Sequence, residues 1–296
     1  MKLNINNILF ISTIHILPLI TSSYFEINQL NSILLLWAFK CIGVTTGMHR
    51  LWTHQSYNTH PLIKLVLLTS CNSTFEGSVK TWTIDHKMHH RFEESDRQYL
   101  DPYSIKKGFF WAHTLCHIVE KSDEYKIEAK KVEKELYYSR PNLDNMMIEF
   151  EDVYYLQLAL FTGIIFPTLL FKIIYYNHSI ISCFYSVILS ILLTYHCTWS
   201  INSFAHMIGD KPYSTKHTSC DNHLISIFTF GEGYHNYHHS FPKDYKASHT
   251  LQAFNITGWF IFLLYKLDLA YDLKEVSKIK KTEMPDLDNI EYEILA

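Results

Sequence analysis

The sequence lacks any C-x-x-C pair, although it contains six cysteines. Three of the cysteines lie inside apolar runs, where a free cysteine behaves as a small buried hydrophobe. We therefore interpret them as reduced, and nothing in their spacing indicates a disulfide scaffold. The six residues are Cys41, Cys71, Cys116, Cys183, Cys197 and Cys220.

The sequence also lacks an excess of charge of one sign. Lys and Arg number 26, Asp and Glu number 29, and the formal net charge is -3. A nucleic-acid partner would require a clustered basic face, so we expect none. No internal repeat of solenoid period is present either. The chain of 296 residues is expected to form one domain over residues 1–296.

Long apolar runs predict a membrane protein. Four stretches are apolar over about the 17–25 residues that a spanning helix needs, namely residues 8–25, 31–48, 153–176 and 179–203. A fifth, residues 61–75, is shorter and carries Lys64, which favours an interfacial or buried helix.

Four spans would form two hairpins with both termini on one side of the bilayer. The remaining sequence, residues 49–152 and 204–275 with a tail at 276–296, carries nearly all Lys and Arg, which favours the cytosol. The predicted fold class is an all-α integral membrane protein with four transmembrane helices in two hairpins beneath a cytosolic helical cap.

Histidine is abundant, and half of the 18 histidines occur in short clusters. In the two H-x-x-H-H strings, positions i, i+3 and i+4 share one face of a helix. Imidazole suits iron, copper, zinc and nickel, and one zinc needs four ligands. Nine imidazoles therefore suggest two metals. The candidate ligands are His49, His54, His86, His89, His90, His206, His235, His238 and His239.

The other histidines, among them His15, His113, His117 and His196, are interpreted as ordinary hydrogen-bonded or surface residues. The same interpretation of the clustered nine is disfavoured, because two H-x-x-H-H strings and one H-x-x-x-x-H string all follow membrane spans or lie between them.

Five strings carry a family likeness: "GMHRLWTH", "DHKMHHRF", "DPYSIKKGFF", "TWSINSFAHMIGDKPY" and "GEGYHNYHHSFPKDYKAS". In order and spacing the chain resembles the membrane-bound acyl-CoA desaturases of the stearoyl-CoA delta-9 type, from about Leu34 to Lys278. The resemblance implies a di-iron site held by the nine histidines, with Asn202 reaching an iron through water. It leaves open which histidine serves which iron.

Further roles follow from the resemblance. Trp82 and Trp199 match tryptophans that line the acyl tunnel, and Trp37 and Cys41 match residues that limit acyl length. Because Trp37 and Cys41 are bulky, we expect a preference for palmitoyl over stearoyl chains; the alternative is that Trp37 is simply a packed membrane tryptophan. Residues expected to support the ligands from behind are Asp85, Glu232 and Asn236.

The implied activity is O2-dependent desaturation of a long-chain fatty acyl-CoA to a cis-monounsaturated product, at the delta-9 position, in the endoplasmic reticulum membrane. The sequence has no H-P-G-G-like haem motif, so electrons are expected from cytochrome b5 and its NADH-dependent reductase. An acyl-lipid desaturase or a fatty acyl hydroxylase on the same irons is the enzymatic alternative. A metal transporter is disfavoured, since its ligands would lie within the spans, and an inactive homologue is disfavoured by the complete histidine set.

Overall fold

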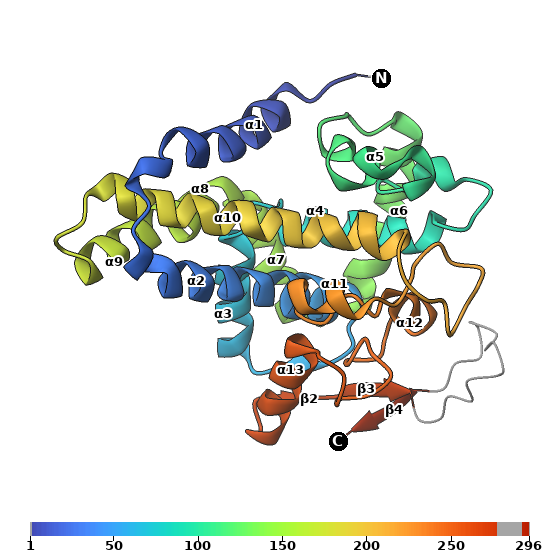
Figure 1. Cartoon of the computed structure of the whole chain (residues 1–296). Coiled ribbons are helices and arrows are strands. Elements are labelled where there is room, and N and C mark those ends of the chain that lie inside the picture. The colour runs from blue at the N-terminus through green and yellow to red at the C-terminus, as the bar shows by residue number, and fades with distance from the viewer. Residues whose placement is uncertain (1, 277–291, 296) are drawn as a thin grey trace.

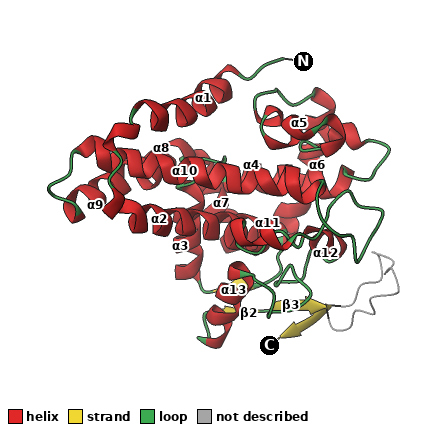
Figure 2. Ribbon diagram, viewed as in Figure 1, coloured by secondary structure: helices red, strands yellow, loops and turns green. Residues whose placement is uncertain are grey.

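Helices dominate the computed structural model, which describes residues 2–276 and 292–295 (Figures 1 and 2). The α-helices are α1 (Ile5–Ile20), α2 (Leu30–Ile42), α3 (Pro61–Asn72), α4 (Val79–Phe92), α5 (Phe109–His113), α6 (Asp123–Ser139), α7 (Asn142–Val153), α8 (Tyr155–Leu160), α9 (Phe166–Ile174), α10 (Ile180–Ser203), α11 (His223–Phe228), α12 (His235–Ser240) and α13 (Ile256–Lys266).

Two π-helical segments interrupt the α-helices, η3 (Gly43–Thr53) after α2 and η7 (Phe161–Ile165) between α8 and α9. The short 3-10 helices are η1 (Ser22–Tyr24), η2 (Ile27–Gln29), η4 (Gln98–Leu100), η5 (Ile105–Lys107), η6 (Leu115–His117) and η8 (Phe204–His206). Two antiparallel strand pairs complete the fold: β1 (Asn58–Thr59) with β2 (Ala270–Tyr271), and β3 (Leu273–Val276) with β4 (Tyr292–Leu295). Most of the tail predicted at 276–296 lies outside the described residues.

Three helices are long and apolar enough to cross a membrane within the described ranges: Ile27–Thr53, Tyr155–Ile174 and Ile180–His206. The first predicted span, residues 8–25, corresponds to α1, which has 16 residues and ends before a 3-10 turn at Ser22. At 1.5 Å per residue α1 is about 24 Å long, short of the roughly 30 Å hydrocarbon core. The prediction of four spans in two hairpins is therefore not confirmed.

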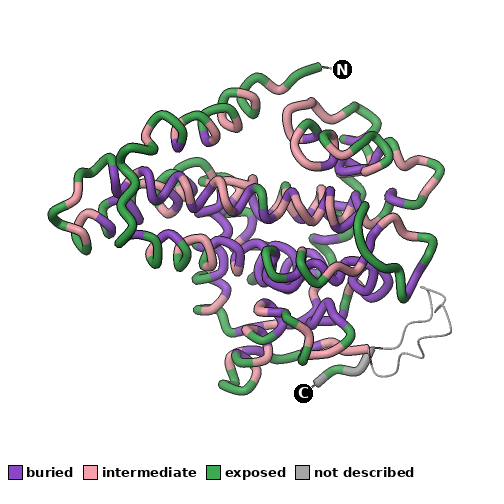
Figure 3. Tube along the Cα trace, viewed as in Figure 1, coloured by how far each residue is buried: buried purple, intermediate pink, exposed green. Residues whose placement is uncertain are grey.

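Apolar side chains are exposed along the helices at one end of the molecule. Leu19 in α1, Leu35 in α2 and Ile173 in α9 are each more than two-thirds exposed. The same end, around α1, α2 and α9, is largely green in Figure 3. A large exposed apolar surface on long helices is what a bilayer covers.

Lys40 is fully buried within the first candidate span. Its ammonium group donates to the backbone carbonyl of Ser73, at the end of α3. The carbonyls at a helix end lack partners within the helix and carry partial negative charge, so a cation there is stabilised. Lys40 thus joins α2 to α3 inside the protein rather than reaching toward the membrane surface.

The cap lies at the other end of the molecule and is built from α4, α6, α11 and α12 (Figure 1). Burial is greatest in α12 and η3, whose residues are all buried (Figure 3). Helix α4 packs its apolar face on α6 through a cluster that includes Met88 and Val132, both fully buried. That packing fixes the opposite, histidine-bearing face of α4 toward α12 and η3.

Candidate metal centre

Four separate segments carry the clustered histidines. His49 lies in η3, and His54 follows it directly. In a π-helix the backbone bonds join residues five apart, and here the His54 N–H donates to the His49 carbonyl at 3.1 Å. The local π geometry therefore explains how two histidines spaced five apart share one side. Helices α4 and α12 carry the two H-x-x-H-H strings, and His206 ends η8.

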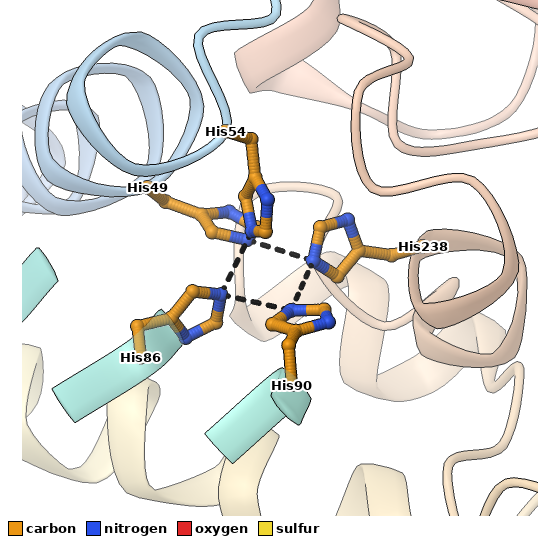
Figure 4. Close-up of side chains that lie close together, drawn as sticks. All are labelled: His49, His54, His86, His90 and His238. Carbon is orange, nitrogen blue, oxygen red and sulfur yellow. Dashed lines mark hydrogen bonds between the residues drawn. The ribbon is translucent and has the colours of Figure 1, made fainter. Parts of the chain in front are cut away.

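Five imidazoles converge in the first group, which Figure 4 shows. The ligand nitrogens all lie within 4.8 Å of one another, and the members are His49, His54, His86, His90 and His238. The Nε2 of His238 lies 3.0 Å from that of His49 and 3.1 Å from that of His90. A ring nitrogen carries one proton at most, so one Nε2 cannot donate to two neighbours.

These spacings fit a metal. With metal–nitrogen bonds of about 2.1 Å, two ligands at right angles lie about 3 Å apart. Without a cation between them, lone pairs this close would repel. The first group therefore has the donor set and the spacing of a metal's coordination shell.

The second group contains four buried imidazoles, His89, His206, His235 and His239. The Nε2 atoms of His235 and His239 are 3.0 Å apart. The Nε2 atoms of His89 and His206 are buried and make no hydrogen bond within the described chain. Unpaired buried nitrogens are costly, and a bound metal would satisfy them.

Carboxylates hold the second nitrogen of several imidazoles. His89 Nδ1 donates to Asp101 at 2.9 Å. Oxygens of Glu232 and Glu93 lie 3.0 Å and 2.5 Å from Nδ1 of His49 and His239, respectively. A proton held on Nδ1 leaves the Nε2 lone pair free for a metal, and the carboxylate fixes the ring's orientation.

Two of these carboxylates are themselves held charged. Burial alone would raise the pKa of Glu232, but Arg50, 2.7 Å away, helps to lower it. Burial opposes ionisation of Glu93 as well, and His239 and His206 beside it lower its pKa well below the usual range. Each group therefore rests on buried negative charge that complements a cation.

Several of the imidazoles are kept neutral. Burial, and then the neighbouring imidazoles, lower the pKa of His54, His86 and His90 well below 6.5. Burial likewise lowers the pKa of His239 to about 3. Burial also opposes charge on His89, but Asp101 outweighs it and raises that pKa. Neutral imidazole is the form that binds metals.

Two residues expected behind the ligands lie elsewhere. Asp85 accepts from the Tyr125 hydroxyl and pairs with Lys121 at 3.2 Å, because it sits on the side of α4 that faces α6. The Asn236 amide binds the backbone of Tyr213 and Ser214, tying that loop to α12. The expectation that Asp85 and Asn236 orient an imidazole is corrected, whereas Glu232 lies against His49.

Asn202 is buried at the end of α10, four residues before His206. The two tryptophans taken from the resemblance occupy different surroundings. Trp82 stacks on His86, with ring centroids 5.0 Å apart. Trp199 is fully buried on α10, in a cluster with Ile14 and Tyr195.

Sequence reasoning missed Glu93, Asp101 and His217. Glu93 stands four residues after His89 and caps the C-terminal end of α4 in helical conformation, a spacing that keeps both on one helix face. Asp101 and His217 give no comparable signal, because the chain must fold back to bring them in. His217 Nδ1 lies 3.7 Å from Glu93.

Over its described residues the structure is mostly helical, with three helices that could span a membrane and two histidine groups that could hold metal ions. The model of the fatty acid desaturase family matches residues 30–255, which is most of the chain. The chain belongs to that family.

Curated relatives agree. The chain is 32% identical to stearoyl-CoA desaturase 5 of Bos taurus, over 92% of this chain and 80% of the relative. It is 35% identical to stearoyl-CoA desaturase of Sus scrofa, over 82% of this chain and 67% of the relative. Acyl-CoA desaturase 1 of Saccharomyces cerevisiae is 34% identical over 80% of this chain but only 44% of its own length.

Proposed function

We propose that this protein is an O2-dependent fatty acyl-CoA desaturase that forms a cis double bond at the delta-9 position. The observation that carries the proposal is the pair of imidazole groups, five and four, each backed by buried carboxylates. Family membership and relatives named for stearoyl-CoA and acyl-CoA support the reaction and the substrate class.

The nine histidines would bind two metals, with Asn202 contributing through water, and iron is the metal that suits the reaction. Removing hydrogen from an unactivated methylene needs a redox-active metal with O2 and two electrons, whereas zinc has no redox chemistry. In this centre Glu232, Glu93 and Asp101 would hold Nδ1 protons on three ligands, which keeps their Nε2 atoms free and fixed in direction.

The acyl chain would lie against Trp82, which stacks on the ligand His86, and against Trp199. Its methyl end would reach Trp37 and Cys41 on α2. Trp37 packs edge-on against Phe230, with centroids 5.1 Å apart, and Cys41 Sγ lies 3.7 Å from Cys197 Sγ. This closed apolar cluster supports a limit on chain length and the preference for palmitoyl chains.

Cytochrome b5 and its NADH-dependent reductase would supply the electrons. The endoplasmic reticulum membrane, with the cap and both termini in the cytosol, would be the location; this topology requires α1 to enter the membrane as a fourth span. The three candidate spans support a membrane location, and the metal groups at the cap end support catalysis at the cytosolic surface.

The test uses membranes containing the full chain, NADH, cytochrome b5 and its reductase. Palmitoyl-CoA and stearoyl-CoA are supplied together, and mass spectrometry identifies the fatty acids and the double-bond position. We expect delta-9 monoenes with palmitoleoyl in excess, lost in His238→Ala and retained in His178→Ala, which alters a histidine far from both groups.

The same assay separates the alternatives. A product heavier by one oxygen would identify a hydroxylase. Monoene found on phospholipid before acyl-CoA would identify an acyl-lipid desaturase. Absence of any product with active electron partners would reject the proposed reaction.

A further inference from the structure

Four histidines outside the two metal groups surround one tryptophan. The rings of His15, His113, His117 and His196 lie 5.4–6.0 Å, centroid to centroid, from the buried indole of Trp199. They come from α1, from the neighbouring segments α5 and η6, and from α10, so three distant parts of the sequence meet here. Such a gathering of imidazoles on one residue is not explained by the metal centre.

Three of these imidazoles form a continuous chain of polar contacts, which we call the imidazole relay. His15 Nδ1 lies 2.7 Å from the Ile11 carbonyl. His15 Nε2 lies 3.2 Å from His196 Nε2, and His196 Nδ1 lies 3.2 Å from His113 Nε2. His113 Nδ1 lies 2.9 Å from Ser203 Oγ, which in turn donates to the Trp199 carbonyl at 2.8 Å.

The relay has too few protons when its imidazoles are neutral. Both of its ends are backbone carbonyls, which accept and never donate. Its five contacts therefore require five protons. Three neutral imidazoles supply one each and the Ser203 hydroxyl supplies one, which makes four. If the Ser203 hydroxyl instead donates to His113, the contact with the Trp199 carbonyl lacks a proton, so the relay is still one proton short.

We propose that the imidazole relay is a one-proton clasp: uptake of a single proton completes all five contacts and fastens α1 and α5 to α10 over Trp199. When that proton is absent, one of the five contacts places two acceptor atoms opposite each other, and this contact opens. The proposal concerns residues outside the metal groups and does not depend on the reaction catalysed there.

No carboxylate competes for the proton on the elements that meet at the relay. Helix α1 has no titratable side chain besides His15, and α5 has none besides His113. Near His196, helix α10 offers Tyr195 and Cys197, and η6 offers Cys116 and His117. Lys121 beyond η6 lowers the pKa of His117 further, after burial, to about 3, so His117 stays neutral.

The closed relay would add to contacts that already join the segment before α1 to the segment after η6. The chain before α1 pairs with the segment after η6: the Asn4 N–H donates to the Ile118 carbonyl at 2.9 Å. Lys2 and Glu120 form an ion pair at 2.9 Å. Helices α1 and α5 both contact α10, and they are joined to each other by these contacts and by the relay.

The direction of the switch follows from the surroundings of His113. Burial lowers the pKa of this imidazole below 6.5. At neutral pH the relay is therefore one proton short, and it gains the proton as the pH falls below that value. All five contacts are therefore complete in acid, whereas one of them is open in neutral or alkaline solution.

The proton count identifies a decisive variant. Ser203→Ala removes one proton and two contacts, leaving three contacts for three neutral imidazoles, so the shortage disappears. Ser200→Ala is a matched control, because Ser200 also donates to a carbonyl four residues earlier on α10, that of His196, but lies outside the relay. Bound metal is measured in both variants, to show that the neighbouring centre is intact.

The experiment measures the distance between α1 and α5 by pulsed electron spin resonance, in the full chain in lipid nanodiscs. Spin labels are placed at Leu9→Cys and Phe110→Cys, whose native side chains are 62% and 74% exposed; the six native cysteines are buried. Spectra are compared at about pH 8 and about pH 5.5, the range over which histidine titrates.

In the otherwise native chain and in Ser200→Ala, the narrow, closed population is expected to at least roughly double on acidification, since one proton completes the relay. In Ser203→Ala it is expected to be high and equal at both pH values. A distribution in the native chain that does not change with pH, or a pH response that survives in Ser203→Ala, would overturn the proposal.

Discussion

The histidines of the cap and those of the imidazole relay differ in what holds their second nitrogen. In the cap, carboxylates lie against Nδ1 of His49, His89 and His239, so the free Nε2 atoms converge. In the relay, both nitrogens of His196 face other imidazoles, and the ends of the chain are carbonyls. A metal site therefore needs buried negative charge behind its imidazoles, and clustering alone gives a proton-binding chain.

The largest expected effect comes from removing a single histidine from either metal group. His238→Ala and His235→Ala remove one member from the first and second group, and each should lower turnover more than about 100-fold, since even the loss of a ligand's supporting partner costs about 10–100-fold. His196→Ala should leave the metal content unchanged. Metal analysis of the purified variants and single-turnover assays measure these effects. Equal metal loss in all three variants would contradict the distinction between metal-binding histidines and relay histidines.

The next effect tests the carboxylates. Asp101→Asn keeps the size of the side chain but removes the charge beside His89, and should lower metal affinity or activity by about 10–100-fold. Asp85→Asn, on the same cap but against Tyr125 and Lys121, should change activity less than about twofold if support for the ligands is what matters. Similar losses in both variants would show that general cap stability is being measured.

Acid should destabilise the folded, metal-bound protein but close the imidazole relay. The imidazoles of His54, His86 and His90 have pKa values below 6.5, so below pH 6.5 the unfolded chain takes up protons first. Folded, metal-bound protein should therefore lose stability as the pH falls below 6.5, while the relay closes. Thermal midpoints and bound metal, followed between about pH 7.5 and 5, should fall together; a stability that rises on acidification would contradict this sign.

The smallest expected effect concerns Glu76, which lies between the metal centre and the imidazole relay. Glu76 accepts from the Trp82 indole at 3.2 Å and from Thr198 at 2.7 Å, and burial raises its pKa to about 7. The folded chain then holds a proton that the unfolded chain releases above pH 4.5, so this carboxyl lowers stability as the pH rises from 4.5 to about 7.

Glu76→Gln removes that penalty, because its oxygen can accept from Trp82 and its amide can donate to Thr198. The variant should be more stable than the native chain at pH 8 by roughly 3 kcal/mol and nearly equal to it at pH 4.5. Denaturation midpoints at the two pH values measure the difference. Destabilisation by Glu76→Gln at pH 8 would show that the carboxylate is the stabilising form.

The fold was predictable where composition dictates it. Runs of apolar residues identified α2 with η3, α8 with α9, and α10, because a membrane demands length and apolarity that the sequence displays directly. The same criterion predicted a fourth span over residues 8–25, which is not confirmed, because the helix there ends at Ile20. The burial of Lys40 against the Ser73 carbonyl was equally invisible, since its partner is 33 residues away.

The sequence alone determined the nine clustered histidines, because helical spacing places i, i+3 and i+4 on one face and because the motif strings are specific. Only the tertiary structure decided that they divide into five and four, that Glu93 and Asp101 rather than Asp85 stand behind them, and that His15, His113 and His196 meet at all. Local periodicity is written in neighbouring residues, whereas the charge and the proton count of a site depend on which distant segments packing brings within 3 Å.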